Sequence, residues 1–441
     1  MPLGKLMLLL RLPHSNQNHN KTHNLISQGF AFVGFFYAQI PTIYKGNLAM
    51  PEQFLHGVEV VEIDTGPRPI RTVKSSIIGL IGTAPAADAA AFPINTPVLV
   101  AGNRTEAAKL GADGSLPSAI DSIFDQAGAM VVIVRVEEGA DEDETIGNIV
   151  GGVDVDTGQY EGVQAFLGAE SVVHVSPRIL IAPGFTHQRP SGNANPVVAE
   201  LIGIAERLRA VIIADAPSTN DADAITYRGD FGSPRVYVID PFVKIFDTET
   251  DSVITQPSSG RVAGVIVKTD NERGFWWSPS NRNINGIIGS ERPVGFVLGD
   301  TNARANHLNE NEVATIIRQD GYRLWGNRTC SSDPKWAFLS VRRTADIIND
   351  SLLRAHLWAV DRNITKTYIE DVVEGVNGYL ATLKALGAIL GGRCYADPEL
   401  NTPANITQGK VFFDFDFTPP YPAEHINFRS HLVNDYIEEI F

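Results

Sequence analysis

The chain contains 441 residues, of which 44% are hydrophobic and 20% are charged, a composition typical of two or three packed domains and not of a disordered chain. Its 36 basic and 51 acidic residues give a net charge of −15, which argues against non-specific nucleic-acid binding through phosphate contacts. Cys330 and Cys394 are too few for a disulfide framework, and no apolar run reaches the roughly 18 residues of a membrane span.

The first 49 residues differ in composition from the rest of the chain. They contain no Asp or Glu, and their basic residues are Lys5, Arg11, Lys21 and Lys45. The codons of Lys45-Gly46 contain the purine core of a bacterial ribosome-binding site, and Met50 follows at a normal start spacing. We therefore expect 1–49 to be a misassigned start or a disordered extension, with translation beginning at Met50.

The next two regions are an N-terminal arm, 50–74, with a short strand at 58–63, and a longer region, 75–260, in which two kinds of segment alternate. Continuous apolar runs indicate strands buried on both faces, and amphipathic segments indicate helices. The predicted strands are 75–82, 130–136, 178–182, 210–215 and 235–240, and the predicted helices are 105–110, 117–126, 160–168, 196–209 and 222–227, the last capped by Asn220. This alternation predicts an α/β layer with a largely parallel sheet.

The pattern changes beyond residue 240. Strands are predicted at 242–255 and 262–269, and helices at 309–320, 341–361 and 366–390, with Asn309 as the cap of the first helix. Phe413, Phe415 and Phe417 share one face of a strand over 411–417, because polar residues alternate with them. A partner strand is then suggested by Ile426, Phe428 and Leu432. We expect an inner α+β domain over 261–410 and a C-terminal β arm over 411–441.

Three short patterns resemble parts of functional sites and are better explained as structure. Asp64-Thr65-Gly66 matches a protease triplet, but the proline that follows predicts a turn. Gly79 and Gly82 lie inside an apolar run and lack the third glycine of a dinucleotide-binding motif, which favours close packing. The acidic segment 137–144 lacks the ligand pattern of a calcium loop and is expected to be a solvated loop. We therefore assign no catalytic, cofactor-binding or metal-ligating residue.

The segment 274–281 is the most unusual part of the sequence. Its adjacent tryptophans could line a site for a sugar or an aromatic ligand, but such a cluster is more often a core anchor. Its members that we single out are Gly274, Phe275, Trp276, Trp277, Ser278, Pro279 and Asn281.

Several blocks of the chain together resemble the tail sheath proteins of contractile-tailed bacteriophages. The resemblance runs from about 54 to 437, and 261–287 and 340–365 are its longest and most specific parts. The blocks are HGVEV (56–60), SSIIGLIGTAP (75–85), RILIAPGF (178–185), AVIIADAP (210–217), RVAGVIVKTDNERGFWWSPSNRNINGI (261–287), LNENEVATIIRQDGYRLWGNRT (308–329), SVRRTADIINDSLLRAHLWAVDRNIT (340–365) and GKVFFDFDFTPPYPAEHINFRSHLVNDYI (409–437).

This resemblance implies a structural protein and not an enzyme. Such proteins form stacked six-fold rings around a tail tube, in a sheath whose contraction drives the tube through the host envelope. The implied partners are other copies of the chain, the tail tube protein, and the baseplate and tail terminator proteins, with no cofactor, no nucleic acid and no membrane insertion. The implied fold has an outer α/β part of subtilisin-like topology without a catalytic triad, an inner C-terminal domain, and β arms at both ends. The implied location is the tail of the virion, after assembly in the bacterial cytoplasm.

The resemblance also implies roles for particular residues. Strands of the two arms are expected to add to the sheets of neighbouring subunits, and the candidate residues are Val58, Val60, Val61, Ile63, Phe413, Phe415, Phe417, Ile426, Phe428 and Leu432. Arg342, Arg343 and Arg354 are candidates for contact with the tube. The other interpretation of these arginines is a surface helix that pairs them with Asp346 and Asp350.

Three other functions stay open from the sequence. A phage-derived particle, such as a tailocin or an extracellular injection system, needs the same kind of sheath. A hydrolase would use a group such as Asp64 in the α/β region. A carbohydrate-binding module would use Trp276 and Trp277.

Overall fold

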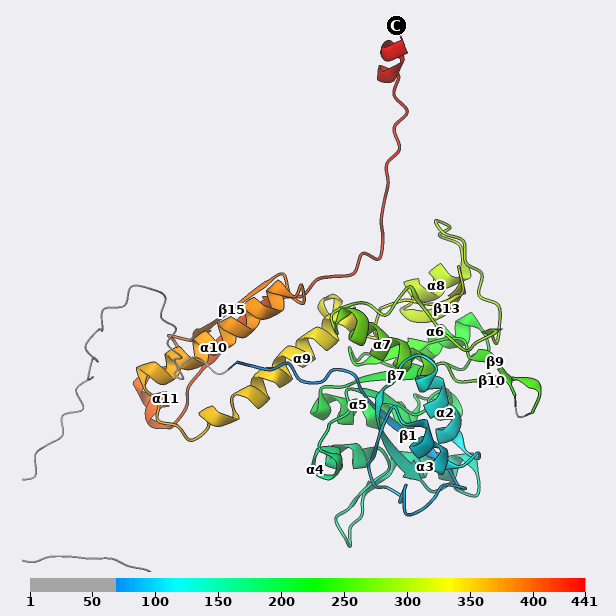
Figure 1. The fold of residues 1–441 in the computed structure, drawn as a ribbon, viewed down its shortest axis with the longest axis horizontal. Coiled ribbons are helices and arrows are strands. Elements are labelled where there is room, and N and C mark those ends of the chain that lie inside the picture. Colours follow the sequence, from blue (N-terminus) through cyan, green and yellow to red (C-terminus); the bar gives the residue numbers. More distant parts are fainter. Residues whose placement is uncertain (1–68, 249, 441) are drawn as a thin grey trace, which may run out of the picture. The chain divides into compact units, whose positions relative to one another are not determined.

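The computed structural model describes residues 69–248 and 250–440, and its largest element is a nine-stranded sheet with the order β11-β14-β13-β8-β7-β6-β1-β3-β2 (Figure 1). The strands from β13 to β3 in this order are parallel, and antiparallel strands lie at both edges. The bounds are β1 Ile77–Thr83, β2 Val98–Ala101, β3 Met130–Val136, β6 Ile179–Ile181, β7 Val211–Asp215, β8 Val236–Ile239, β11 Arg282–Asn283, β13 Val313–Arg318 and β14 Tyr322–Trp325. The predicted α/β layer with a largely parallel sheet is confirmed.

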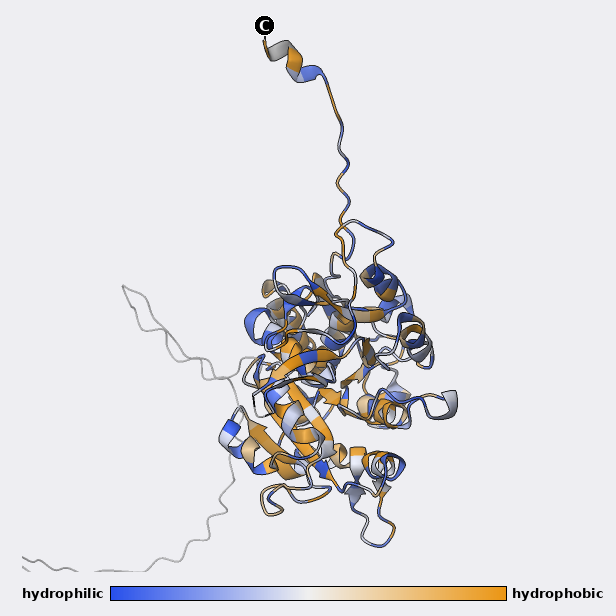
Figure 2. Cartoon of the chain, turned by 90° about the vertical axis from the view of Figure 1, so that its right-hand side faces the viewer, coloured by the Kyte–Doolittle hydropathy of each residue, from blue (hydrophilic) through white to orange (hydrophobic). Residues whose placement is uncertain are grey.

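Helices cover both faces of this sheet, which is why its strands are continuous apolar runs (Figure 2). Along β1, Ile78 and Leu80 pack against α2 (Ser115–Phe124) and α7 (Ser259–Arg273), whereas Ile77 and Ile81 face α5 (Pro196–Leu208). The shorter helices include α1 (Arg104–Ala107), α3 (Glu142–Val150), α4 (Ala169–Val173) and α6 (Asp221–Gly229). The cap predicted for α6 is confirmed, since the Asn220 side chain accepts a hydrogen bond from the Asp223 amide at 2.9 Å.

The close packing predicted for the glycines of β1 is also confirmed. A Cβ atom on Gly79 would lie 2.8 Å from Leu180 Cδ2, and one on Gly82 would lie 2.2 Å from Ser115 Oγ. The first contact is with the neighbouring strand β6 and the second is with α2, so both sides of β1 depend on the missing side chains.

Residues 262–269 form part of helix α7, so the strand predicted there is wrong. Val262, Ala263, Val265, Ile266 and Val267 are all buried, and a helix buried on all sides shows no polar stripe. Such a run cannot be distinguished from a buried strand by its periodicity. The close approach to α2 explains the glycines of α7, because a Cβ on Gly260 would lie 2.2 Å from Ser122 Oγ and one on Gly264 would lie 2.8 Å from the Ile123 carbonyl oxygen.

The helix predicted over 309–320 is wrong as well. Helix α8 spans Arg304–Glu310 and strand β13 follows it. Asn309 is therefore inside α8 and is not a cap; its amide donates to the carbonyls of Val313 and Trp325, at 3.1 Å each. These two bonds join the end of α8 to the strands that follow.

Three smaller differences concern segments that were predicted as single elements or loops. The region 242–255 is a hairpin of β9 (Val243–Asp247) and β10 (Ser252–Gln256). Residues 160–168 form β5 (Tyr160–Glu161) and a 3-10 helix, Gly162–Gly168. The acidic loop is wrong in its second half, because Asp141 caps α3 and the acidic residues after it fill the first helical turn, where the helix dipole favours negative charge.

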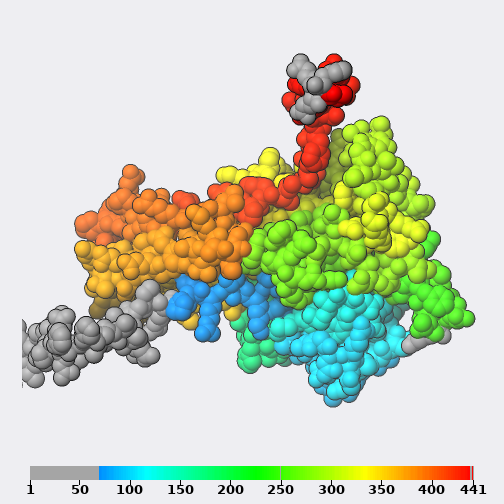
Figure 3. All heavy atoms as spheres, turned by 45° about the horizontal axis from the view of Figure 1, so that its top comes forward, coloured from blue at the N-terminus to red at the C-terminus, as the bar shows by residue number. Residues whose placement is uncertain are grey.

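The C-terminal part has its own core, formed by α9 (Leu339–Ala355), α10 (Lys366–Ala385) and the antiparallel pair β15 (Gly391–Ala396) and β16 (Phe413–Thr418). The long helices and the strand at 411–417 are confirmed as α9, α10 and β16. The predicted partner strand at 426–432 is wrong, since β16 pairs with β15. Residues 419–434 contain no helix or strand, and 423–437 are exposed (Figure 3).

Candidate assembly surfaces

The described residues contain no group of three or more His, Cys, Asp or Glu that is placed to hold a metal ion. Within 69–248 and 250–440 no helix is long and apolar enough to cross a bilayer. Enzymes with a parallel sheet often place their sites at the carboxyl ends of the strands.

Buried acids do lie at that edge, but the chain itself satisfies them. Asp215 accepts hydrogen bonds from the amide and the hydroxyl of Ser259, and burial raises the pKa of Asp215 to about 6. Asp240 accepts from the Ser218 amide at 3.0 Å and pairs with Arg292, and burial raises its pKa to about 6 as well. The carboxyl edge is thus filled by a structural network that holds β7, β8 and α7 together.

The aromatic residues of β16 lie on the face that packs against α10. Phe413 and Phe417 are half-buried against the C-terminal core, whereas Phe415 keeps 36% of its surface exposed. The rings of Phe415 and Phe417 stack with their centroids 6.1 Å apart. The apolar face of the β15–β16 pair therefore continues to the outer edge of β16, where it is exposed to solvent.

The tail that follows β16 exposes large apolar side chains. Ile426, Phe428 and Leu432 have exposed fractions of 67%, 91% and 101%. The contiguous exposure of such residues marks an interaction surface. Val58, Val60, Val61 and Ile63, the candidates of the N-terminal arm, lie outside the described residues.

The three arginines of α9 all form ion pairs within the chain. Arg342 pairs with Asp346 at 2.8 Å, and Arg354 pairs with Asp350 at 3.1 Å and with Glu170 at 2.8 Å. The paired-helix interpretation thus describes Arg342 and Arg354.

Arg343 differs from the other two arginines because its side chain is only 4% exposed. It pairs with the equally buried Asp270 of α7, whose carboxylate also accepts from Ser75 and Ser76. In this structure its guanidinium is enclosed by the subunit and does not offer a surface contact.

Other ion pairs attach α9 to the amino-terminal ends of two sheet strands. Arg178 precedes β6 and pairs with Asp350, and Arg235 precedes β8 and pairs with Asp346 at 2.8 Å. These partners were not predicted from the sequence. The signal that the sequence offers is that each arginine stands directly before a buried apolar strand.

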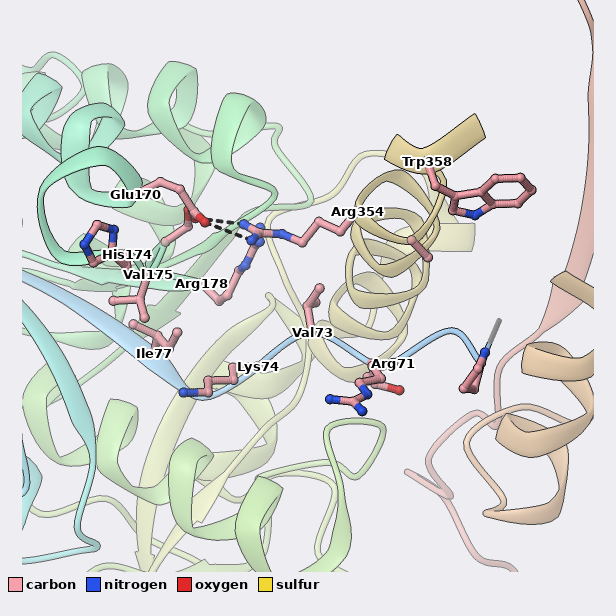
Figure 4. Close-up of a pocket in the computed structure, with 14 residues that line it drawn as sticks. Arg71, Val73, Lys74, Ile77, Glu170, His174, Val175, Arg178, Arg354 and Trp358 are labelled. Atoms are coloured by element: carbon pink, nitrogen blue, oxygen red, sulfur yellow. Dashed lines mark hydrogen bonds and ion pairs between the residues drawn. The ribbon is translucent and has the colours of Figure 1, made fainter. Parts of the chain in front are cut away.

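A hollow of about 610 Å³ lies where the segment 69–77 passes the end of α9 (Figure 4). Arg354 crosses it to reach Glu170, and the hydrogen bonds from Arg354 lower the pKa of Glu170 to about 2. Val73 and Trp358 contribute apolar surface to its wall, and the Val73 amide donates to Ser351 Oγ at 3.0 Å. At this junction, α4 and α9 are held together by ion pairs and not by a continuous apolar core.

The segment 274–281 links the end of α7 to the C-terminal core. Gly274 ends α7 with φ of 106°, and Phe275 is buried in the C-terminal core, where Trp276 meets it edge-on at 5.1 Å. Trp277 is half-exposed beneath the Arg273 guanidinium, 5.0 Å away. Pro279 is buried, Ser278 Oγ accepts from the Ser280 amide at 3.2 Å, and Asn281 donates its amide to the Leu324 carbonyl at 2.6 Å. The core-anchor interpretation describes the first two aromatic residues.

Comparison with protein families finds three matching models along the chain. They are the tail sheath protein Gp18 domain III N-terminal region over 75–136, the phage tail sheath protein central domain over 158–330, and the phage tail sheath C-terminal domain over 331–432.

Similar whole proteins come from phages and prophages. A prophage major tail sheath protein of Pseudomonas aeruginosa (strain UCBPP-PA14) is 43% identical over 388 residues, which is 88% of this chain and 98% of that protein. The tail sheath protein of Escherichia phage P2 is 37% identical over 392 residues, 87% of this chain and 97% of that protein.

Two solved structures share the fold at low identity. The helical sheath of the anti-feeding prophage in its contracted state matches with a TM-score of 0.64 and 19% identity, covering 86% of this chain and 99% of that one. The sheath complex of the extracellular contractile injection system PVC, also contracted, matches with a TM-score of 0.63 and 16% identity, covering 87% and 99%.

Proposed function

The chain belongs to the family of phage tail sheath proteins, and we propose that it polymerises as stacked six-fold rings around a tail tube and drives this tube through the host envelope by contracting. The family is a structural one. The observation that carries the mode of assembly is the exposed C-terminal segment, whose apolar residues have no partner within the described chain.

Strand donation explains this exposure. An isolated strand segment with apolar side chains is an aggregation hazard unless another sheet receives it. A tail that pairs with the sheet of a second copy buries these side chains, and because donor and acceptor surfaces differ, the contact repeats without closing and builds a helix. The N-terminal arm, with Val58, Val60, Val61 and Ile63, is proposed to act in the same way.

The work of contraction is proposed to come from bistable packing between subunits. The structural character of the family supports a chain that needs no catalysis of its own for this work. A gain of about a few kcal/mol per subunit, typical of alternative packings, becomes large when many subunits change state together.

The tube, the baseplate and the tail terminator are the proposed partners besides other copies of the chain. Arg342 and Arg354 stay candidates for contact with the tube, because their side chains keep 13% and 46% of their surface exposed while they are bound to their carboxylates. Arg343 would need to leave its buried pair with Asp270 to take part.

The sheath of a tailocin or of an extracellular injection system is the second candidate. The shared fold with the anti-feeding prophage and PVC sheaths supports it. For the phage-tail form, we propose assembly in the bacterial cytoplasm and a final location in the virion tail.

Truncation of the full chain after Pro422 tests strand donation. We expect wild-type protein to form regular tubes in negative-stain electron micrographs, and the truncated protein to stay soluble with unchanged circular dichroism but without tubes. A second variant replaces Ile426, Phe428 and Leu432 with Ser, and its matched control replaces Asn427 and His431, which alternate with them, and keeps Arg429. Loss of tubes in the first and not in the control supports donation of an apolar strand face, whereas normal tubes from the truncated chain would exclude it.

A further inference from the structure

The two strands of the β15–β16 pair have outer edges that differ chemically. In an antiparallel pair, alternate residues direct their N–H and C=O groups toward the partner strand or away from it. The Asp397 amide donates to the Phe412 carbonyl, and the register places Cys394 opposite Phe415. The pair 394–415 lies three positions from the hydrogen-bonded pair 397–412 and is therefore not bonded across the strands. Cys394 and Phe415 thus direct their main-chain groups to the two outer edges.

The outer edge of β15 is occupied by a side chain of α10. Asn377 accepts a hydrogen bond from the Cys394 amide at 2.8 Å and donates one to the Cys394 carbonyl at 2.9 Å. The amide group thus makes the two bonds that a neighbouring strand would make. A strand that pairs at the centre of this edge must first displace Asn377.

The outer edge of β16 has no such cover among the described residues. Phe413, Phe415 and Phe417 direct their N–H and C=O groups outward, and β16 has β15 as its only described neighbour. The apolar face of this sheet also ends here, with Phe415 partly exposed. A strand added at this edge would gain main-chain bonds and cover the phenylalanine pair.

The C-terminal tail of a second copy matches this edge in its charge as well as in its alternation of apolar residues. When Phe428 lies beside the phenylalanines, Arg429 points to the opposite face of the sheet, the face of Asp414 and Asp416. Arg429 is the only basic residue after Lys410. Opposite charges on neighbouring strands stabilise the pairing, so this single arginine favours β16 as its acceptor.

Resting on the proposed strand donation, we propose that Asn377 closes the β15 edge, so that the C-terminal segment 426–432 of a second copy pairs with β16 alone. Asn377 is then a positioning residue that fixes the side on which the chain grows. With one edge closed, each sheet accepts one tail, and side growth of the polymer is suppressed.

Proline substitutions on the two edges test which edge is used. Proline removes an N–H group, and at an outward-facing position it breaks no bond between β15 and β16. We expect Phe415→Pro to lower the amount of sedimentable tubes by about tenfold or more, because it removes a main-chain bond to the incoming strand. Phe415→Ala, which keeps the N–H group, controls for the lost ring. Ala396→Pro, on the outer edge of β15, should assemble like the wild type.

The outcomes separate this inference from strand donation itself. If Ala396→Pro blocks assembly and Phe415→Pro does not, the edge assignment is overturned while strand donation stands. If neither blocks it, strand donation to this sheet fails altogether. Circular dichroism and size-exclusion chromatography of the unassembled variants verify that each is folded.

A substitution of Asn377 tests its role as the cover. Asn377→Ala should open β15 and produce tubes with laterally attached material, and the double variant with Ala396→Pro should return to separate tubes because the opened edge is blocked again. Tubes of wild-type appearance from Asn377→Ala alone would refute the covering role. The control Asn405→Ala removes an amide that bonds to the Leu400 carbonyl, away from this edge.

Discussion

Replacing Asp346 with Asn should destabilise the subunit far more than removing an exposed carboxylate from a neighbouring helix. The Asp346 carboxylate is almost fully buried and receives two hydrogen bonds from Arg235, at 2.8 and 3.2 Å, and two from Arg342, at 2.8 and 3.2 Å. Asn has nearly the same shape but no charge, so the substitution leaves the buried guanidinium of Arg235 without its main counterion. Breaking a buried pair from one side costs about 3–5 kcal/mol.

The matched control is Glu370→Gln, which makes the same chemical change in the exposed pair of Lys366 and Glu370 on α10. An exposed pair of this kind contributes about 0.2–1 kcal/mol. The free energies of unfolding are measured by urea titration of unassembled full-length protein, followed by far-ultraviolet circular dichroism. An Asp346→Asn effect as small as that of the control would refute the reasoning that this pair fastens α9 to the sheet.

The remaining predictions concern packing and pH. Gly79→Ala should destabilise by about 1–3 kcal/mol through overpacking, whereas Gly203→Ala, exposed in α5, should stabilise by up to about 1 kcal/mol; urea titrations compare them. Hydrogen bonds from Arg354 lower the pKa of Glu170 from 4.5 to about 2, so the stability that this pair contributes is complete above pH 4.5 and is lost as the pH falls toward 2. In Arg354→Met, the melting temperature should therefore depend less on pH across that range than in the wild type. The pKa of Asp215 is raised from 3.8 to about 6 by burial, so stability should decrease as the pH rises from 3.8 to 6, and Asp215→Asn should remove part of that decrease.

The α/β part could be predicted from sequence because its strands are buried on both faces. Runs such as 130–134 and 210–214 contain no polar residue, and a parallel sheet covered by helices gives every residue of such a short strand apolar neighbours. The same logic failed for α7, where burial on all sides produces an equally apolar run in a helix. Period alone cannot separate these cases, because a fully buried element has no polar face to reveal it.

The family, the order of most elements and the exposed, alternating character of the C-terminal segment could be predicted from the sequence, because they depend on residues that are neighbours in the chain. Which side chains meet became visible only in the folded chain. Arg343 finds Asp270 and Arg178 finds Asp350 across long stretches of chain, and Asn377 covers Cys394 because α10 lies along β15. A charged or polar side chain carries no local mark of its partner, because the partner is set by where the folded backbone brings a second charge or an unpaired amide within hydrogen-bond distance.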